Sequence, residues 1–167
     1  MDTPSFPDLI RDHAGLIHKV AYAYCRSASD REDVRQEIVV QLWRAMDRYD
    51  GRCAITTWIY RIALNVAISC HRRERRHQQG RQPFDDELHA LAEPAAAPSE
   101  DVQRLLACID DLPPLDKALV LLYLDGHDHA ATAEVLGLSV SNVGTRLHRI
   151  KDKLRVAFAR RPEPSKE

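Results

Sequence analysis

The 167-residue sequence is poor in aromatic side chains, in glycine and in long apolar runs. Aromatic residues make up 6% of the chain and glycine occurs six times, whereas alanine, leucine, arginine and glutamate are common. This balance favours helices over sheets. No segment approaches the roughly 18 apolar residues that span a membrane, and the first ten residues lack the basic start and apolar stretch of a secretory signal. We therefore expect an all-α, cytoplasmic protein with no membrane insertion.

Residues that could hold a metal or perform catalysis are also sparse. The four cysteines are far apart and form no CxxC pair, so buried, reduced thiols are expected. His127 and His129 have no matching second pair of ligands, which argues against a zinc site. The sequence contains no P-loop and no nucleophile with an adjacent base. It therefore predicts no metal, no cofactor and no enzymatic activity.

The net charge of −1 conceals two basic patches and an acidic middle. Residues 71–81 hold five arginines and one glutamate, and residues 142–161 hold seven basic residues and one aspartate. Between them, residues 82–116 hold nine acidic residues and one arginine. Basic patches of this kind point to a polyanionic partner such as nucleic acid.

Helical periodicity divides the chain into two domains. Apolar residues recur at helical spacing over 8–25, over 31–49 and from Thr56 or Thr57 into the first basic patch. A threonine hydroxyl is expected to cap the third helix. The apolar stripe of that helix comprises Trp58, Ile59, Ile62, Ala63, Val66 and Ala67, and Trp58 and Ile62 are expected in the core. Prolines then interrupt an acidic, flexible linker with a short helical piece near 85–91. We predict helical domains at residues 1–78 and 100–160, a linker at 79–99 and a tail at 161–167.

The second domain carries a helix-turn-helix pattern. An apolar helix over 115–124 and a short helix over 129–136 precede Gly137, which permits positive φ, and Ser139, which can cap the next helix. That last helix is apolar on one side and basic elsewhere, as a helix that enters the DNA major groove must be. The residues best placed for base edges are Asn142, Thr145 and Arg146, and those best placed for phosphates are Arg149, Lys151 and Lys153. The alternative is a solvated terminal helix.

Three segments carry motifs in chain order. The first is Asp33-Val34-Arg35-Gln36-Glu37 with Trp43 downstream, the second is residues 57–65 followed by Arg72-Arg73, and the third is residues 112–154. They resemble the DxxQE…W motif, the TW-aliphatic-x-RIAxN motif and the C-terminal promoter-binding module of one family, the extracytoplasmic-function group of sigma-70-family RNA polymerase sigma factors. The chain departs from the family at Ile55, where Phe is frequent, and at residues 131–133, where an acidic residue is frequent.

The resemblance implies a factor that binds the largest subunits of the RNA polymerase core and directs initiation at promoter DNA. Residues 1–78 would bind core polymerase and the −10 element and assist strand opening, and residues 100–160 would bind the −35 element. The implied core-binding residues are Asp33, Gln36, Glu37 and Trp43. The implied −10 residues are Asn65, Ser69, Arg72 and Arg73, with Arg52 in the preceding loop. The implied −35 residues are Asn142, Thr145, Arg146, Arg149 and Lys151.

Two further expectations bear on partners. Family members are often held inactive by an anti-sigma factor, so the resemblance adds such a protein to the expected partners. The rival hypothesis is a stand-alone helix-turn-helix regulator. It explains residues 112–154 but assigns no role to the motifs of the first domain.

Overall fold

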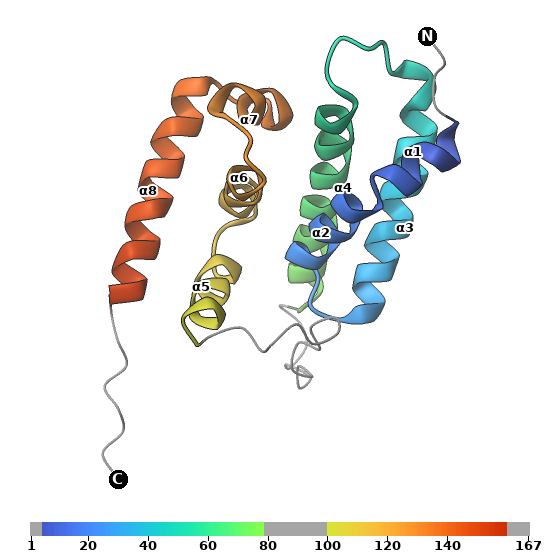
Figure 1. The fold of residues 1–167 in the computed structure, drawn as a ribbon. Helices are drawn as coiled ribbons and strands as arrows, with labels where there is room; N and C mark the ends of the chain where they lie inside the picture. The colour runs from blue at the N-terminus through green and yellow to red at the C-terminus, as the bar shows by residue number, and fades with distance from the viewer. Residues whose placement is uncertain (1–4, 79–99, 160–167) are drawn as a thin grey trace. The chain divides into compact units, whose positions relative to one another are not determined.

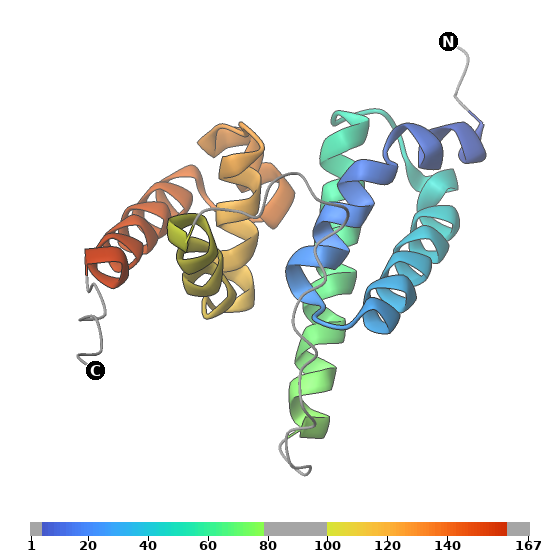
Figure 2. The ribbon, with the colours of Figure 1, turned by 60° about the horizontal axis from the view of Figure 1, so that its bottom comes forward.

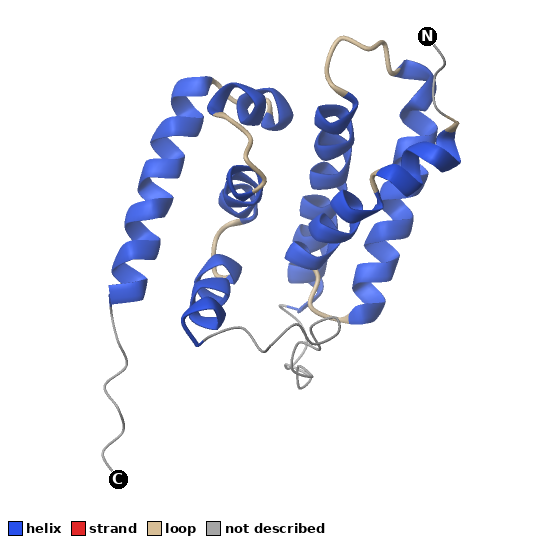
Figure 3. Ribbon diagram, viewed as in Figure 1, coloured by secondary structure: helices blue, strands red, loops and turns tan. Residues whose placement is uncertain are grey.

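The computed structural model describes residues 5–78 and 100–159, which form helices joined by turns, with no strand in those ranges (Figures 1 and 3). The predicted all-α class is therefore confirmed. The helices belong to two compact units. Those of the first are α1 (Phe6–Asp12), α2 (Ala14–Tyr24), α3 (Ala28–Ala45), the short 3₁₀ helix η1 (Met46–Arg48) and α4 (Ile55–Gln78). Those of the second are α5 (Glu100–Asp110), α6 (Pro114–Leu124), α7 (His129–Leu136) and α8 (Val140–Ala159).

Two predicted segments lie outside the described residues, namely the linker at 79–99 with its helical piece and the tail at 161–167. Among the helices that the structure does describe, none is both long and apolar enough to cross a membrane.

Three helix boundaries of the first unit differ from prediction. The predicted helix over 8–25 is two helices, because the backbone leaves helical geometry at His13 (φ −111°, ψ 14°). Helix α3 begins three residues early, since the Ser27 hydroxyl accepts a hydrogen bond from the Asp30 amide at 3.0 Å and so caps the helix. Helix α4 begins at Ile55, so the predicted threonine cap is wrong.

The core of the first unit lies where α2, α3 and α4 pack against one another, as the two views in Figures 1 and 2 agree. Helix α4 buries part of the predicted stripe, since Ile59, Ala63 and Ala67 are completely buried, whereas Trp58 and Ile62 remain partly exposed. Tyr60 and Leu64, which the prediction did not include, are buried as well. The side chains that are completely buried are Val20, Ala21, Ile38, Leu42, Ile59, Ala63 and Ala67.

The second unit contains the predicted helix-turn-helix. Asp128 caps α7 through a 2.7 Å bond from the Ala131 amide, and Gly137 ends it in the left-handed region at φ 67°. The Ser139 hydroxyl then accepts from the Asn142 amide at 3.1 Å and caps α8. Buried Val143, Leu147 and Ile150 give α8 one apolar strip, which packs on α6. The turn chemistry predicted from Gly137 and Ser139 is confirmed.

Replacing Gly137 with alanine should destabilise the second unit by about 1–2 kcal/mol. The Cβ would meet no atom within 4 Å, so the whole cost arises from holding a side chain at positive φ. Urea unfolding followed by circular dichroism measures it. Gly15→Ala is the matched control, because Gly15 lies in helix α2 with the same open space around it, and alanine there should be neutral or stabilising. Equal effects of the two substitutions would contradict the role of the left-handed cap.

Candidate polymerase-binding and nucleic-acid interfaces

The polar residues predicted on α3 share one exposed side of that helix. Asp33, Gln36 and Glu37 are all exposed, and the helical period places them on the same side. The stripe continues through Val40, 38% exposed, to Trp43, 66% exposed. Trp43 and Val40 thus leave adjacent apolar side chains exposed on this stripe, and an exposed tryptophan is a residue type that binding surfaces favour. Val40 was missed by the sequence analysis, although it lies four residues after Gln36.

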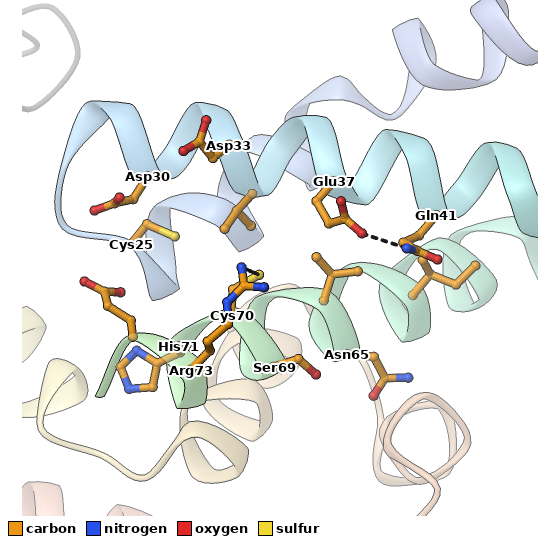
Figure 4. A pocket seen from close by; sticks show the side chains of 14 residues that line it. Cys25, Asp30, Asp33, Glu37, Gln41, Asn65, Ser69, Cys70, His71 and Arg73 are labelled. Carbon is orange, nitrogen blue, oxygen red and sulfur yellow. Dashed lines mark hydrogen bonds between the residues drawn. The ribbon is translucent and has the colours of Figure 1, made fainter. Parts of the chain in front are cut away.

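A groove of about 1080 Å³ runs between α3 and α4 (Figure 4). Two residues from the predicted core-binding set, Asp33 and Glu37, line it from α3. Three from the predicted −10 set line it from α4, namely Asn65, Ser69 and Arg73. The structure therefore brings together residues that the sequence analysis had assigned to separate sites. Arg72 is exposed on α4 but does not line the groove.

The α3 side of the groove is acidic. Asp30 joins Asp33 and Glu37, and the Glu37 carboxylate accepts a hydrogen bond from the Gln41 amide at 2.6 Å (Figure 4). Gln36 lies on the outer side, where its amide donates to Glu32 at 3.2 Å. The groove thus offers carboxylates from α3 and arginine and amide groups from α4, which suits a partner with both charge signs.

Two thiols lie at the same groove and differ from ordinary cysteines. Burial, with a smaller contribution from the nearby carboxylates of Asp30 and Glu74, raises the pKa of the Cys25 thiol to about 12. Burial also raises the pKa of Cys70, while the Arg73 guanidinium, which donates to its sulfur at 3.9 Å, opposes that rise. Both thiols are therefore protonated and weakly nucleophilic near neutral pH. Of the four cysteines predicted to be buried, Cys25 is buried, whereas Cys53, Cys70 and Cys108 are partly exposed.

Cys25 should react with iodoacetamide at pH 8 at least tenfold more slowly than Cys53 or Cys108, which are more exposed. Peptide mapping by mass spectrometry measures the rates. Because the folded state raises this pKa, the stability that the protonated thiol contributes is complete below pH 9 and is lost as pH rises toward 12. Labelling of all three cysteines at one rate in the native protein would contradict this picture.

The loop before α4 is held by its own side chains. The Tyr49 hydroxyl donates to the Cys53 carbonyl at 2.7 Å, and the Tyr49 ring lies 5.2 Å from the ring of Trp58 between centroids. Arg52 points outward, and its guanidinium pairs with Asp50 at 3.0 Å. It does not line the groove, so it stands apart from the other predicted −10 residues.

The predicted DNA-reading residues of α8 divide into two groups. A shallow pocket of about 230 Å³ is lined by Asn142, Thr145, Arg146, Arg149 and Lys153 from α8 together with Asp116 from α6. Lys151 is not among them. Its ammonium lies 4.1 Å from the centroid of the Tyr123 ring, on the other flank of the buried strip of α8. The structure thus groups Lys153, and not Lys151, with the remaining predicted residues.

Arg146 is bound within the second unit. Its Nη1 donates to the buried Asp116 carboxylate at 2.9 Å, and its Nε donates to Oδ1 of Asn142 at 3.2 Å. Arg149 and Thr145 remain exposed on the adjoining face. Asp116 was missed by the sequence analysis, because it lies thirty residues before its partner in a segment that was predicted only as an apolar helix.

Comparison with known proteins identifies the family. The model of sigma-70 region 2 matches residues 9–77, and that of sigma-70 region 4 matches residues 102–154. The curated relatives include the ECF RNA polymerase sigma factor SigE of Mycolicibacterium smegmatis, 28% identical over 94% of this chain, and SigW of Bacillus subtilis, 25% identical over 92%. The chain belongs to the extracytoplasmic-function sigma factors. This sigma factor spans 63% of the length of that SigE and 89% of that SigW.

Solved structures agree on the fold of this sigma factor. The sigma factor RpoE of Bartonella quintana, in complex with the anti-sigma factor NepR, superposes with a TM-score of 0.75 at 17% identity, over 96% of this chain and 100% of that one. CnrH, in complex with the cytosolic domain of CnrY, gives 0.67 at 22% identity, over 92% and 87%.

Proposed function

We propose that this chain binds RNA polymerase core and directs it to promoters by recognising −35 and −10 elements. The observation that carries the proposal is the pair of region matches, in chain order, on two units that each present a suitable surface. The first unit exposes the Asp33–Trp43 stripe of α3, and the second exposes the basic face of α8. The chain acts as a non-enzymatic subunit in the cytoplasm, where polymerase works.

The roles divide between the units. The exposed stripe of α3 contacts the largest polymerase subunits. Helix α4, through Asn65, Ser69, Arg72 and Arg73, together with Arg52 of the preceding loop, contacts the −10 element and assists strand opening, since an opened base can be held by stacking and by hydrogen bonds. Helix α8 reads the −35 element in the major groove. Because both units belong to one chain, the second promoter contact is intramolecular, which raises its effective concentration.

An anti-sigma factor is a further partner. RpoE and CnrH were solved with the proteins NepR and CnrY bound, and this chain shares their fold. The exposed stripe of α3 and the acidic groove beside it are surfaces that an inhibitor could cover to exclude polymerase.

A test separates this function from that of a stand-alone helix-turn-helix regulator. Labelled promoter duplex is mixed with the purified chain, with core polymerase and with both. Specific, heparin-resistant binding is expected only with both. Tight, specific binding by the chain alone, with no association with core, would favour the regulator. The stand-alone regulator hypothesis assigns no role to residues 9–77, which match sigma-70 region 2.

Asn65→Ala should slow promoter opening about tenfold or more, because losing one amide–base pairing costs about 1–3 kcal/mol. Asn65 is exposed on α4, beside Ser69 in the groove, so the fold should persist. Permanganate reactivity of unpaired thymines follows opening. A template that is already unpaired across the −10 element should restore activity. Asn142→Ala serves as the contrast, since its defect should not be rescued by premelting. If premelted templates fail to rescue Asn65→Ala, the residue does not act in opening.

A further inference from the structure

We propose that Asp116 is a positioning residue that sets the base specificity of α8 through Arg146 and Asn142, an inference that rests on the proposed −35 role of this helix. Three side chains form one chain of contacts. The buried Asp116 carboxylate accepts from Nη1 of Arg146 at 2.9 Å, and Nε of the same guanidinium donates to Oδ1 of Asn142 at 3.2 Å. All three line the shallow pocket beside α8.

The first consequence concerns Arg146. A free arginine on a recognition helix can swing to the nearest phosphate, which carries no sequence information. Here such a swing would leave the buried Asp116 carboxylate without its cation, and an unpaired buried charge is costly. Asp116 therefore holds the guanidinium in one direction, and its negative charge offsets part of the attraction to the DNA backbone.

The second consequence concerns Asn142. An arginine Nε is only a donor, so the amide of Asn142 must turn its oxygen toward Arg146. Its NH₂ group is then left for the DNA. An asparagine that pairs with adenine needs both its oxygen and its nitrogen, because adenine presents one acceptor and one donor in the major groove. With the oxygen engaged, Asn142 and Arg146 together present only donors.

A pair of side chains that presents only hydrogen-bond donors selects a base edge that presents only acceptors. In the major groove that edge belongs to guanine, whose N7 and O6 both accept. The contacts that run from Asp116 through Arg146 to Asn142 therefore favour guanine over adenine at the base pair that Asn142 and Arg146 face. Asp116 exerts this effect without touching DNA, because its side chain is buried in the first turn of α6.

The test measures base preference at each position. Holoenzyme, reconstituted from the full chain and core polymerase, selects duplexes randomised across the −35 region, and the bound pool is sequenced. Asp116→Asn keeps the shape of the side chain and removes its charge. Asp110→Asn is the matched control. It removes the same charge from a similar ion pair in the same unit, 3.1 Å from Lys117, away from the pocket of α8.

Wild-type holoenzyme is expected to enrich guanine at a position that Asn142→Ala also affects. Asp116→Asn should lower the guanine-to-adenine ratio there by about fivefold or more and leave other positions unchanged. It should also steepen the dependence of binding on salt, by about one phosphate contact. Asp110→Asn should match wild type in both respects.

Three results overturn the inference. One is an unchanged base preference in Asp116→Asn, and another is an equal loss of preference at every position, which indicates general destabilisation. If Asp116→Asn does not fold, Arg146→Gln is tested instead and should lower the preference for guanine at the same position. An unchanged preference in Arg146→Gln is the third result. If wild-type holoenzyme enriches no sequence at all, the proposed function itself is rejected. Enrichment by wild type with no effect of Asp116→Asn rejects only the role of Asp116.

Discussion

Trp43→Ala should weaken binding to core polymerase by about 30-fold or more and leave stability within 0.5 kcal/mol of wild type. An aromatic residue at the centre of an interface typically contributes 2 kcal/mol or more. Because Trp43 is 66% exposed, its removal creates no cavity in the free protein, and surface changes of this kind cost little. Fluorescence anisotropy with labelled chain and unlabelled core measures the affinity, and thermal unfolding measures the stability.

The other tryptophan supplies the matched control. Trp58 is partly buried and packs against the Tyr49 ring, so Trp58→Ala should reduce stability by about 3 kcal/mol through lost packing. Trp43→Ala should therefore lower the affinity for core polymerase, and Trp58→Ala should lower the stability of the fold. If Trp43→Ala binds core polymerase as tightly as wild type does, the exposed stripe of α3 is not the polymerase contact.

Arg149→Ala should weaken binding of holoenzyme to promoter duplex about tenfold or more, whereas Lys151→Ala should weaken it less than threefold. Arg149 is exposed on the face of α8 that carries Asn142 and Thr145, and one hydrogen bond to a charged group such as a phosphate is worth about 1.5–3 kcal/mol. Lys151 lies over the Tyr123 ring on the other flank of the helix. Its replacement removes a cation–π contact worth about 0.5–1 kcal/mol at an exposed site, so any loss should appear in stability.

Filter binding of holoenzyme to promoter duplex, at several salt concentrations, measures this contrast. Arg149→Ala should also flatten the salt dependence if it contacts a phosphate. Lys153→Ala should act in the same direction as Arg149→Ala, since the same pocket includes it. If Lys151→Ala weakens promoter binding more than Arg149→Ala does, the DNA contacts the Lys151 flank of α8 and the proposed DNA-binding face is wrong.

Features encoded by neighbouring residues could be predicted from the sequence. The cap at Ser139, the left-handed Gly137 and the apolar strip of α8 depend on contacts within one or two turns, so local rules suffice. The starts of α3 and α4 were less accurate, because several residues near each start could cap the helix; Ser27, three residues from the capped amide, caps α3. The buried face of α4 was predicted correctly at Ile59 and Ala63. Its edge was predicted on the wrong side, since Tyr60 and Leu64 are buried whereas Trp58 and Ile62 are partly exposed.

Features that depend on how helices pack could not be predicted. The groove shared by Glu37 and Asn65 exists because α3 lies against α4, and nothing in either segment encodes that approach. The pairing of Asp116 with Arg146 joins two helices and is encoded in neither segment alone. The separation of Lys151 from Lys153 could have been predicted, since residues two apart on a helix point about 200° from each other, but the two lysines were grouped by their charge.

Transcription with purified core polymerase tests the central claim most directly. The chain is added to core with a library of genomic fragments from the organism that encodes it, and the 5′ ends of the products are sequenced. Transcripts that begin at defined sites, share upstream −35 and −10 sequences and appear only when the chain is present are the predicted result. Products that do not depend on the chain, or no promoter-dependent product from any fragment, would contradict the account.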